Sequence, residues 1–161
     1  MCDCGFRSDN NWFRYRTGGI IIKDNKMLFV KCSIGGYYYM IGGGVHMGET
    51  SPACVEREVY EEAGIYAKAD RLVVVCENFF KGSGGMVEGL DCHTIEFYYL
   101  MKIREDDPGE CKDRTDEGEE LVWLPIEELQ ENDIKPYFIK DCISEIINED
   151  KIIHIIEEKD R

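Results

Sequence analysis

Three glutamates, Glu58, Glu61 and Glu62, are spaced so that a helix would place them on one face. Like charges at this spacing repel one another, which destabilises a helix unless a positive charge lies nearby. A hard divalent cation such as Mg²⁺ or Mn²⁺ takes oxygen ligands and commonly bridges one or two carboxylates to substrate phosphate. The spacing therefore predicts a metal site that binds a phosphorylated substrate.

The helix that would carry these acids has clear start and stop signals. Ser51 is a candidate N-cap, Pro52 suits the first helical position, and Gly64 suits the position after the end. We expect a helix of about a dozen residues between Ser51 and Gly64. Its apolar positions form a stripe beside the acidic one, so that one side can be buried. The members of this stripe are Val55, Val59 and Ala63.

The stretch from Gly43 to Ile65 resembles the Nudix box at every position. The matching pattern is Gly43, five residues, Glu49, seven residues, Arg57-Glu58-Val59, one residue, Glu61-Glu62, one residue, Gly64-Ile65. The preceding segment GGIIIKDNKMLFVKC and the later segment LVWLPIEEL also lie where Nudix proteins have similar elements. The resemblance implies a pyrophosphohydrolase.

Hydrolysis of a pyrophosphate linkage requires charge neutralisation, an oriented water and stabilisation of the leaving phosphate. Clustered carboxylates provide these through bound metal ions. By the resemblance, Glu58 and Glu62 are the main metal ligands and Glu61 is a further ligand or a water-mediated partner. The carbonyl of Gly42 completes such a shell in related proteins, and the expected cofactor is Mg²⁺ or Mn²⁺.

The resemblance also assigns catalytic roles. Arg57 is expected to orient a glutamate, with Glu49 as its partner. The general base is a box glutamate in some Nudix enzymes, which would be Glu58 here, and an acid from a late loop in others. That loop contains Asp116, Glu117, Glu119 and Glu120. Glu117 is the preferred candidate among them.

Three further residues are candidates for substrate binding, each with a structural alternative. Tyr15, which follows Trp12 and Phe13, could stack on a nucleobase, or these aromatics could cap the core or a dimer seam. His46 could contact substrate or be an exposed loop residue. Glu96 alternates with apolar neighbours in a strand and could reach the metal or substrate, or be an edge-strand charge that preserves solubility.

The composition of the 161-residue chain fits a single domain, residues 1–161. With 43% hydrophobic and 32% charged residues it is typical of globular proteins, and no apolar run has the length of a membrane span. The N-terminus lacks the features of a signal peptide, which favours a cytoplasmic location. A net charge of −14 argues against binding to long nucleic acid.

The chain contains eight cysteines. Without a CxxC pair or a secretory signal, free thiols are favoured over disulfides. A zinc site from Cys2, Cys4, Cys92 and His93 is a weak alternative, because its spacing matches no usual zinc motif.

The period-two and helical patterns predict a mixed sheet with helices on both faces, the α/β/α sandwich that the Nudix resemblance implies, with the box helix lining the active cleft. The expected strands are 18–22, 27–30, 37–41, 71–80, 91–102 and 121–124, with a turn at Asp24-Asn25. Residues 104–120 read as a loop, IEELQEN as a short helix, and the chain from Pro136 as a helix that packs through Ile139, Ile143, Ile146 and Ile147. The final KIIHIIE could extend this helix, add an edge strand or contact a partner chain.

These observations predict metal-dependent hydrolysis of a diphosphate linkage in a nucleoside diphosphate derivative, with ADP-ribose or a modified nucleoside triphosphate as the favoured substrates. The alternative is a nucleotide-sensing Nudix-fold regulator without catalysis, although such proteins commonly lack some of the box glutamates that are all present here. An isomerase acting on an isoprenoid diphosphate is a weaker alternative. Family habit also predicts a homodimer.

Overall fold

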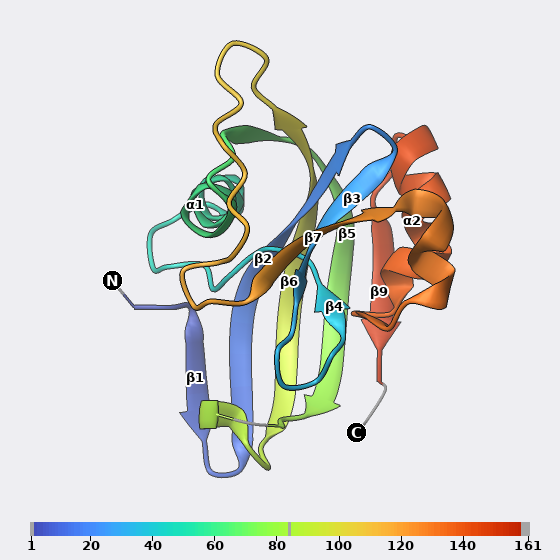
Figure 1. The fold of residues 1–161 in the computed structure, drawn as a ribbon. Helices are drawn as coiled ribbons and strands as arrows, with labels where there is room; N and C mark the ends of the chain where they lie inside the picture. Colours follow the sequence, from blue (N-terminus) through green and yellow to red (C-terminus); the bar gives the residue numbers. More distant parts are fainter. Residues whose placement is uncertain (1, 84, 159–161) are drawn as a thin grey trace.

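The computed structural model describes residues 2–83 and 85–158, in which a mixed sheet has helices on both faces (Figure 1). The strand order is β8-β4-β3-β2-β6-β5-β9, and in addition β1 pairs with β2 and β7 with β3. The strands are β1 Gly5–Ser8, β2 Asn11–Lys23, β3 Lys26–Lys31, β4 Tyr38–Tyr39, β5 Ala67–Lys81, β6 Asp91–Ile103, β7 Glu120–Pro125, β8 Ile134–Lys135 and β9 Ile153–Glu157. The α-helices are α1 Ser51–Ala63 and α2 Phe138–Asn148, and the 3₁₀ helices are η1 Gly85–Val87 and η2 Ile126–Glu131.

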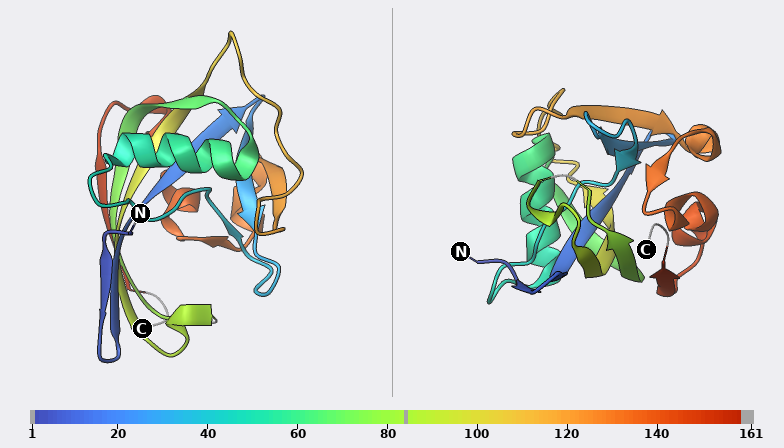
Figure 2. Two further views of the ribbon diagram at one scale, coloured as in Figure 1. Left: turned by 90° about the vertical axis from the view of Figure 1, so that its left-hand side faces the viewer. Right: turned by 90° about the horizontal axis from the view of Figure 1, so that it is seen from below.

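The predicted hairpin between β2 and β3 is confirmed. Asp24 and Asn25 have φ values of 50° and 57°, the left-handed conformation that a tight two-residue turn requires. The two strands pair only through Ile22 with Met27 and Lys23 with Lys26. Beyond these two pairs β2 pairs with β6, and β3 pairs with β7. The sheet therefore divides into two parts that diverge from the hairpin (Figure 2).

The box helix α1 begins one residue earlier than the sequence suggested. Thr50, not Ser51, is the N-cap: its backbone is extended and its hydroxyl accepts a hydrogen bond from Ala53 N at 3.4 Å. The Ser51 hydroxyl is instead hydrogen-bonded to the Tyr99 hydroxyl at 2.8 Å. Gly64 ends the helix as predicted, with a φ of 72° and its N–H bonded to Tyr60 O.

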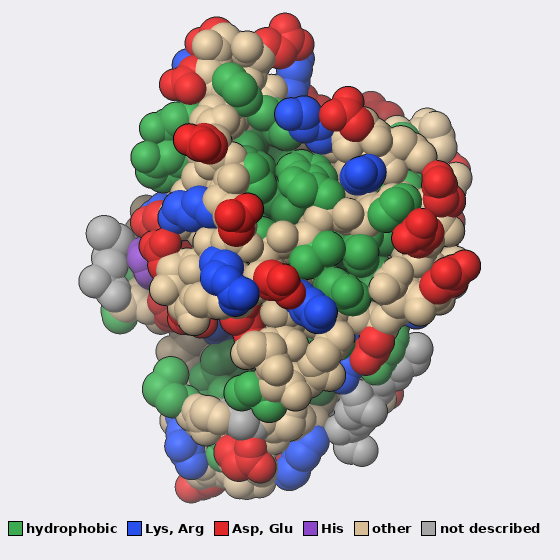
Figure 3. All heavy atoms as spheres, in the orientation of Figure 1, with side chains coloured by type: hydrophobic (Ala, Val, Ile, Leu, Met, Phe, Trp, Pro, Cys, Tyr) green, Lys and Arg blue, Asp and Glu red, His purple; other side chains and the backbone are tan. Residues whose placement is uncertain are grey.

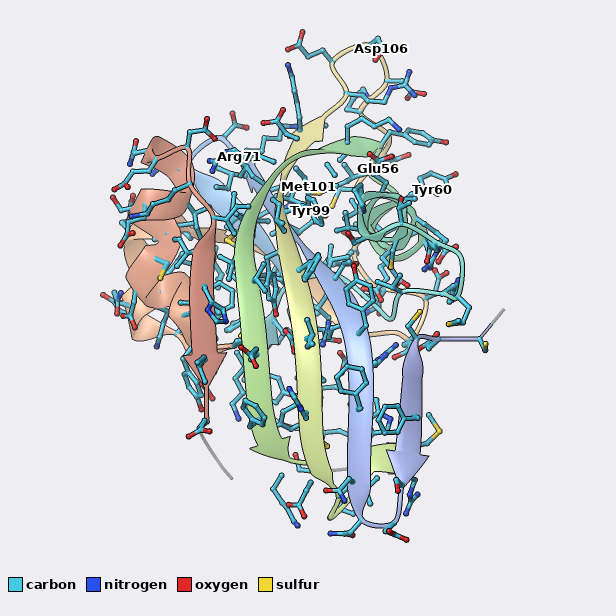
Figure 4. The ribbon with its side chains drawn as sticks, turned by 180° about the vertical axis from the view of Figure 1, so that it is seen from behind. Glu56, Tyr60, Arg71, Tyr99, Met101 and Asp106 are labelled. Atoms are coloured by element: carbon cyan, nitrogen blue, oxygen red, sulfur yellow. The ribbon has the colours of Figure 1, made fainter. Side chains whose placement is uncertain are left out.

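The two α-helices cover opposite faces of the sheet, which confirms the predicted layered architecture (Figure 2). Figure 4 shows Tyr99 and Met101 of β6 on the face that α1 covers. On the other face α2 packs through Ile139, Ile143 and Ile146, whereas Ile147, which we expected to pack, is 41% exposed. The buried residues of α1 are Cys54, Val55, Val59 and Ala63.

Several strand limits differ from the sequence prediction because tertiary pairing extends or shortens them. Strand β2 begins at Asn11 rather than Gly18, since β1 and β6 pair along its first half. Strand β5 begins at Ala67 rather than Arg71. The expected strand 37–41 is reduced to the two residues of β4, and the chain after it runs antiparallel beside β2, with Gly19 N bonded to Ile41 O and Thr17 N to Gly43 O.

The C-terminal elements also resolve open alternatives. Helix α2 begins two residues after Pro136, and IEELQEN forms the 3₁₀ helix η2. The segment KIIHIIE contributes β9, an edge strand parallel to β5. No helix in residues 2–83 and 85–158 is long and apolar enough to cross a membrane. On the face shown in Figure 3, lysine and arginine side chains are interspersed with aspartate and glutamate.

Candidate active site

Arg57 holds the box carboxylates together. Its Nε and Nη2 donate to the two carboxylate oxygens of Glu49 at 2.9 and 3.1 Å, a bidentate pair. Its Nη1 donates to Glu58 at 2.7 Å and to Glu61 at 3.0 Å. The structure therefore contains the Arg57–Glu49 pair that the sequence led us to expect, and the same guanidinium fixes two further acids.

This pairing sets the charges of both partners. The hydrogen bond from Arg57 is the main cause that lowers the pKa of Glu49 to about 2, and the backbone N–H of His46 supports it at 3.0 Å. The pKa of Arg57 is raised, chiefly by its hydrogen bond to Glu49. Both groups are ionised at neutral pH, so their ion pair persists there. Arg57 and its three carboxylate partners, Glu49, Glu58 and Glu61, are called the clamp below.

Glu58 lies directly against the backbone of the glycine turn. A Cβ on Gly43 would be 2.3 Å from Glu58 Oε1, so only glycine admits the carboxylate here. Gly42 is equally constrained, since its Cβ would be 2.0 Å from Thr17 O. The segment beside β2 thus brings Gly42 and Gly43 next to the Glu58 carboxylate.

Glu62 is the most electrostatically strained acid of α1. Burial raises its pKa to about 7, with a further contribution from Glu58, while Arg16 acts in the opposite direction. Glu117 and Asp116 of the late loop also raise it. The loop acids therefore lie within electrostatic reach of Glu62, although the loop is more than fifty residues away in sequence.

The loop of residues 104–119 passes over the C-terminal end of α1 (Figure 2). Lys112 connects the two: its backbone N–H bonds to Ala63 O at 2.9 Å, and its Nζ donates to Glu61 O at 2.6 Å and to Asp116 at 2.8 Å. A cation that caps these carbonyls also complements the negative end of the helix. Lys112 thereby positions the loop acids beside the box.

The four loop acids differ in their engagement. Asp116 is bound by Lys112, and Glu120 lies 3.8 Å from Lys31. Glu119 accepts from the Tyr39 hydroxyl at 2.5 Å and from Ser33 N at 3.0 Å. Glu117 makes no hydrogen bond or ion pair with another described residue, and its role as base stays a prediction.

Tyr15 and His46 lie near the start of α1. Tyr15 is on the sheet face that α1 covers, edge-on to Phe97 at 5.2 Å, and burial raises its pKa. His46 lies between Asp3 and Glu49, with its ring nitrogens 3.6 Å from each carboxylate. The structure thus places both residues beside the Glu49 end of the clamp rather than beside Glu96.

Glu96 is not an edge-strand residue, because β6 lies between β2 and β5. The solubility interpretation was therefore wrong. Glu96 is 2% exposed, and its carboxylate accepts hydrogen bonds from Thr94 at 2.6 Å, Asn78 at 3.3 Å and the Tyr98 hydroxyl. A buried carboxyl group with three hydrogen-bond partners indicates a specific local role.

The carboxylates of α1 fit a hard cation in chemistry but are not gathered around one point. Within the described ranges no three His, Cys, Asp or Glu side chains form a ready metal cluster, since Arg57 holds Glu58 and Glu61. The negative charge that raises the pKa of Glu62 is what a divalent cation would neutralise. Glu58, Glu62 and the Gly42 carbonyl would supply oxygen ligands typical of Mg²⁺ or Mn²⁺.

The cysteines do not form an alternative metal site in the described chain. All eight are free thiols, as predicted. The Cys4 thiol lies 3.4 Å from Met47 Sδ, and the Cys92 thiol donates to Leu90 O. The proposed zinc ligands are thus engaged separately.

A family model for the NUDIX domain matches residues 12–142. The chain belongs to this family. A MutT-like protein from Streptomyces ambofaciens is 25% identical over 124 residues, which cover 77% of this chain and 71% of that protein. The match to the family model covers residues 43–65, confirms their interpretation as a Nudix box and identifies the chain as a Nudix pyrophosphohydrolase.

Solved structures with the same fold include a mutator MutT protein and an ADP-ribose pyrophosphatase. The mutator MutT protein from Bacillus halodurans superposes with a TM-score of 0.68 at 19% identity, covering 91% of each chain. An ADP-ribose pyrophosphatase from Streptococcus suis superposes with a TM-score of 0.63 at 16% identity, covering 89% of this chain and 98% of that one. At these identities the likeness shows the fold alone.

The sequence interpretation missed Arg16, which lies beside Glu96 on β2. The sequence pattern of β2 does contain a signal for Arg16. Extending the period-two pattern of Ile22, Ile20 and Gly18 back by one step reaches Arg16, but the expected strand began only at Gly18.

Glu62 predicts a pH dependence of stability in the metal-free Nudix protein. Its pKa is about 7 in the folded state, against an ordinary value of 4.5. Between these values the folded state retains a proton that the unfolded chain has released, so stability falls as pH rises. We expect the Tm in EDTA to fall between about pH 5 and pH 7.5, and Mg²⁺ to stabilise most at the upper end, because metal binds the deprotonated carboxylate.

The control for this prediction is Glu62→Gln, which cannot titrate. In EDTA, the Tm of the wild type should fall relative to the Tm of this variant as pH rises from about 5 to 7.5. A difference that stays constant from pH 5 to pH 7.5 would contradict the raised pKa.

Proposed function

We propose that this Nudix hydrolase uses Mg²⁺ or Mn²⁺ to cleave the diphosphate linkage of ADP-ribose or of a modified nucleoside triphosphate. The observation that carries the proposal is the partly buried Glu62, whose pKa is raised to about 7 by burial and then by Glu58, against the opposing effect of Arg16, because a bound cation would stabilise these two carboxylates. The names of the relatives, MutT-like and ADP-ribose pyrophosphatase, support these two substrate classes.

Each residue contributes a distinct step. Glu58, Glu62 and the Gly42 carbonyl would hold the cation, which would supply charge neutralisation at the phosphates and a more acidic water. Arg57, fixed by Glu49, orients Glu58. Glu117 is the proposed base because it lies in reach of Glu62 and has no other described partner, with Glu58 as the alternative. Tyr15 and His46, at the Glu49 end of the clamp, are the proposed contacts to the rest of the substrate.

A nucleotide-sensing role without catalysis is the second candidate. It is favoured by the engagement of Glu58 and Glu61 with Arg57, which leaves no preformed cluster of three ligands in the described chain. In that case the clamp would be the resting state of a binding module.

Release of AMP, phosphate or pyrophosphate from ADP-ribose, 8-oxo-dGTP, a dinucleoside tetraphosphate and a nucleotide sugar distinguishes the two candidates. Each substrate is incubated with Mg²⁺, Mn²⁺ or EDTA. We expect cleavage of ADP-ribose or 8-oxo-dGTP that EDTA abolishes. Tight binding without cleavage of any compound would instead favour the sensor.

The proposal includes small-molecule nucleotides as the partners and the cytoplasm, which contains both substrate classes, as the site of action. A homodimer also remains a prediction. Sedimentation as a dimer at micromolar concentration would support it, and a monomer would reject it.

A further inference from the structure

Arg16 lies on the sheet face opposite α1. It is the register partner of Glu96 in the parallel pair of β2 and β6. Its neighbour on the same face is Gly18, where a Cβ would be 2.4 Å from the ring of Tyr98. On the other side of β2, Arg16 forms a backbone bridge with Gly44, next to the glycines that adjoin Glu58. Arg16 is thus adjacent to the box turn but does not belong to the box.

The Arg16 side chain is half-buried, and its buried Nε has no hydrogen-bond partner among the described residues. Its Nε is inaccessible to solvent and makes no hydrogen bond, and no other atom of its side chain forms a hydrogen bond or ion pair with a described residue. Arg57, by contrast, uses all three of its nitrogens. A guanidinium carries five donors, and leaving the buried Nε–H unsatisfied is costly.

Glu96 does not satisfy these donors. Its carboxylate already accepts from Thr94, Asn78 and Tyr98. It nevertheless maintains the charge of Arg16: burial opposes the protonated form, but Glu96, then Tyr98, Tyr39 and Glu62, more than offset this, so the pKa of Arg16 is raised. Glu96 therefore acts as a counter-charge that leaves the donors of Arg16 available.

We propose that Arg16 binds the substrate by donating hydrogen bonds to acceptor atoms of the nucleotide, with Glu96 as its positioning residue. This inference rests on the proposed function for the identity of the ligand. An arginine has donors only, so it suits the oxo groups of guanine or uracil, the acceptor ring nitrogens of a purine, or the oxygens of a phosphate. It does not suit the amino group of adenine.

The surroundings supply both kinds of neighbour. The rings of Tyr37 and Tyr39 have centroids 6.2 Å apart, and the charge of Arg16 acts to lower the pKa of each. Flat rings of this kind are suited to contact a base. The charge of Arg16 also acts to lower the pKa of Glu62, a proposed metal ligand, so Arg16 lies within electrostatic reach of the proposed phosphate site. The common requirement is an acceptor, and the experiment separates its two sources.

Isothermal titration measures the affinity of GMP, UMP, AMP and inorganic pyrophosphate in Mg²⁺ for the wild type, Arg16→Met and Arg16→Lys. We expect Arg16→Met to weaken binding on the order of ten- to a hundredfold, and Arg16→Lys to restore it only in part because lysine cannot donate two parallel hydrogen bonds. Losses for one or more of the nucleotides that exceed the loss for pyrophosphate identify the base as the source of the acceptor. Equal losses for all four probes identify the phosphate.

Arg104→Met is the matched control, because Arg104 forms an exposed ion pair with Asp106 on the late loop and should not affect affinity. Unchanged affinities in both Arg16 variants, or no binding of any probe by the wild type, would overturn the proposal. The monophosphates contain no diphosphate to cleave, so a failure of the proposed hydrolysis leaves this test intact. Hydrolysis that persists while Arg16 variants bind normally would reject Arg16 alone. If Arg16→Met does not fold, Arg16→Lys, which keeps the charge beside Glu96, carries the test.

Discussion

Glu62→Gln should lower turnover by at least about a thousandfold while the fold remains intact, because a neutral amide replaces a charged metal ligand. The substitution keeps the size of the side chain. It also removes a charge whose burial is unfavourable, as its raised pKa shows, so the metal-free variant should be at least as stable as the wild type above pH 7. Steady-state kinetics across Mg²⁺ concentrations, with circular dichroism to verify folding, measure both effects.

Glu56→Gln is the matched control on the same helix. Glu56, labelled in Figure 4, pairs with Lys68 at 2.6 Å and accepts a hydrogen bond from Ala69 N at 3.1 Å, and it forms no hydrogen bond or ion pair with the box acids among the described residues. An exposed pair of this kind contributes little, so turnover should stay near the wild-type value. A wild-type rate in Glu62→Gln, or an equal loss in both variants, would refute the assignment of Glu62 as a metal ligand.

Arg57→Lys should lower kcat about a hundredfold, because small displacements of catalytic groups have effects of this order. Lysine retains the charge but cannot reproduce the bidentate bond to Glu49 together with the bonds to Glu58 and Glu61. Stability should also respond. The lowered pKa of Glu49 contributes stability that is present above about pH 4.5 and lost as pH falls toward 2, and the variant should lose much of it.

A double-mutant cycle with Glu49→Gln tests whether the two residues act as a unit. If Arg57 works through Glu49, the double variant should be little worse than either single variant. Strictly additive losses in kcat would show that the two side chains act independently, and the orienting role of Glu49 would be wrong.

The sequence was most informative where local rules decide the structure. The turn at Asp24-Asn25 and the stop at Gly64 follow from short-range chemistry, the Arg57–Glu49 pair was expected from the Nudix resemblance, and the structure contains all three. Competing local signals explain the error at the start of α1. Thr50 and Ser51 are both good N-cap residues. In the structure the Ser51 hydroxyl is hydrogen-bonded to the Tyr99 hydroxyl, and Thr50 caps the helix.

The remaining features depend on contacts between distant segments. Whether β6 is an edge or an interior strand is decided by its parallel pairing with β2, which no periodicity reveals. The proximity of Glu117 to Glu62 depends on the loop that Lys112 fastens to α1. Arg16 was overlooked because the first half of β2 is stabilised by its neighbours rather than by a strong strand pattern of its own.

The division of the sheet beyond the β2–β3 hairpin places Arg16 and Glu96 on one side, on β2 and β6, and Tyr39 on the other, on β4. The proposed metal ligands come instead from helix α1 and the glycine turn, so the two groups of side chains belong to different elements. A change in a strand residue can therefore alter which nucleotide is accepted without moving a carboxylate of α1. The architecture lets substrate preference diversify in evolution while the hydrolytic chemistry stays fixed.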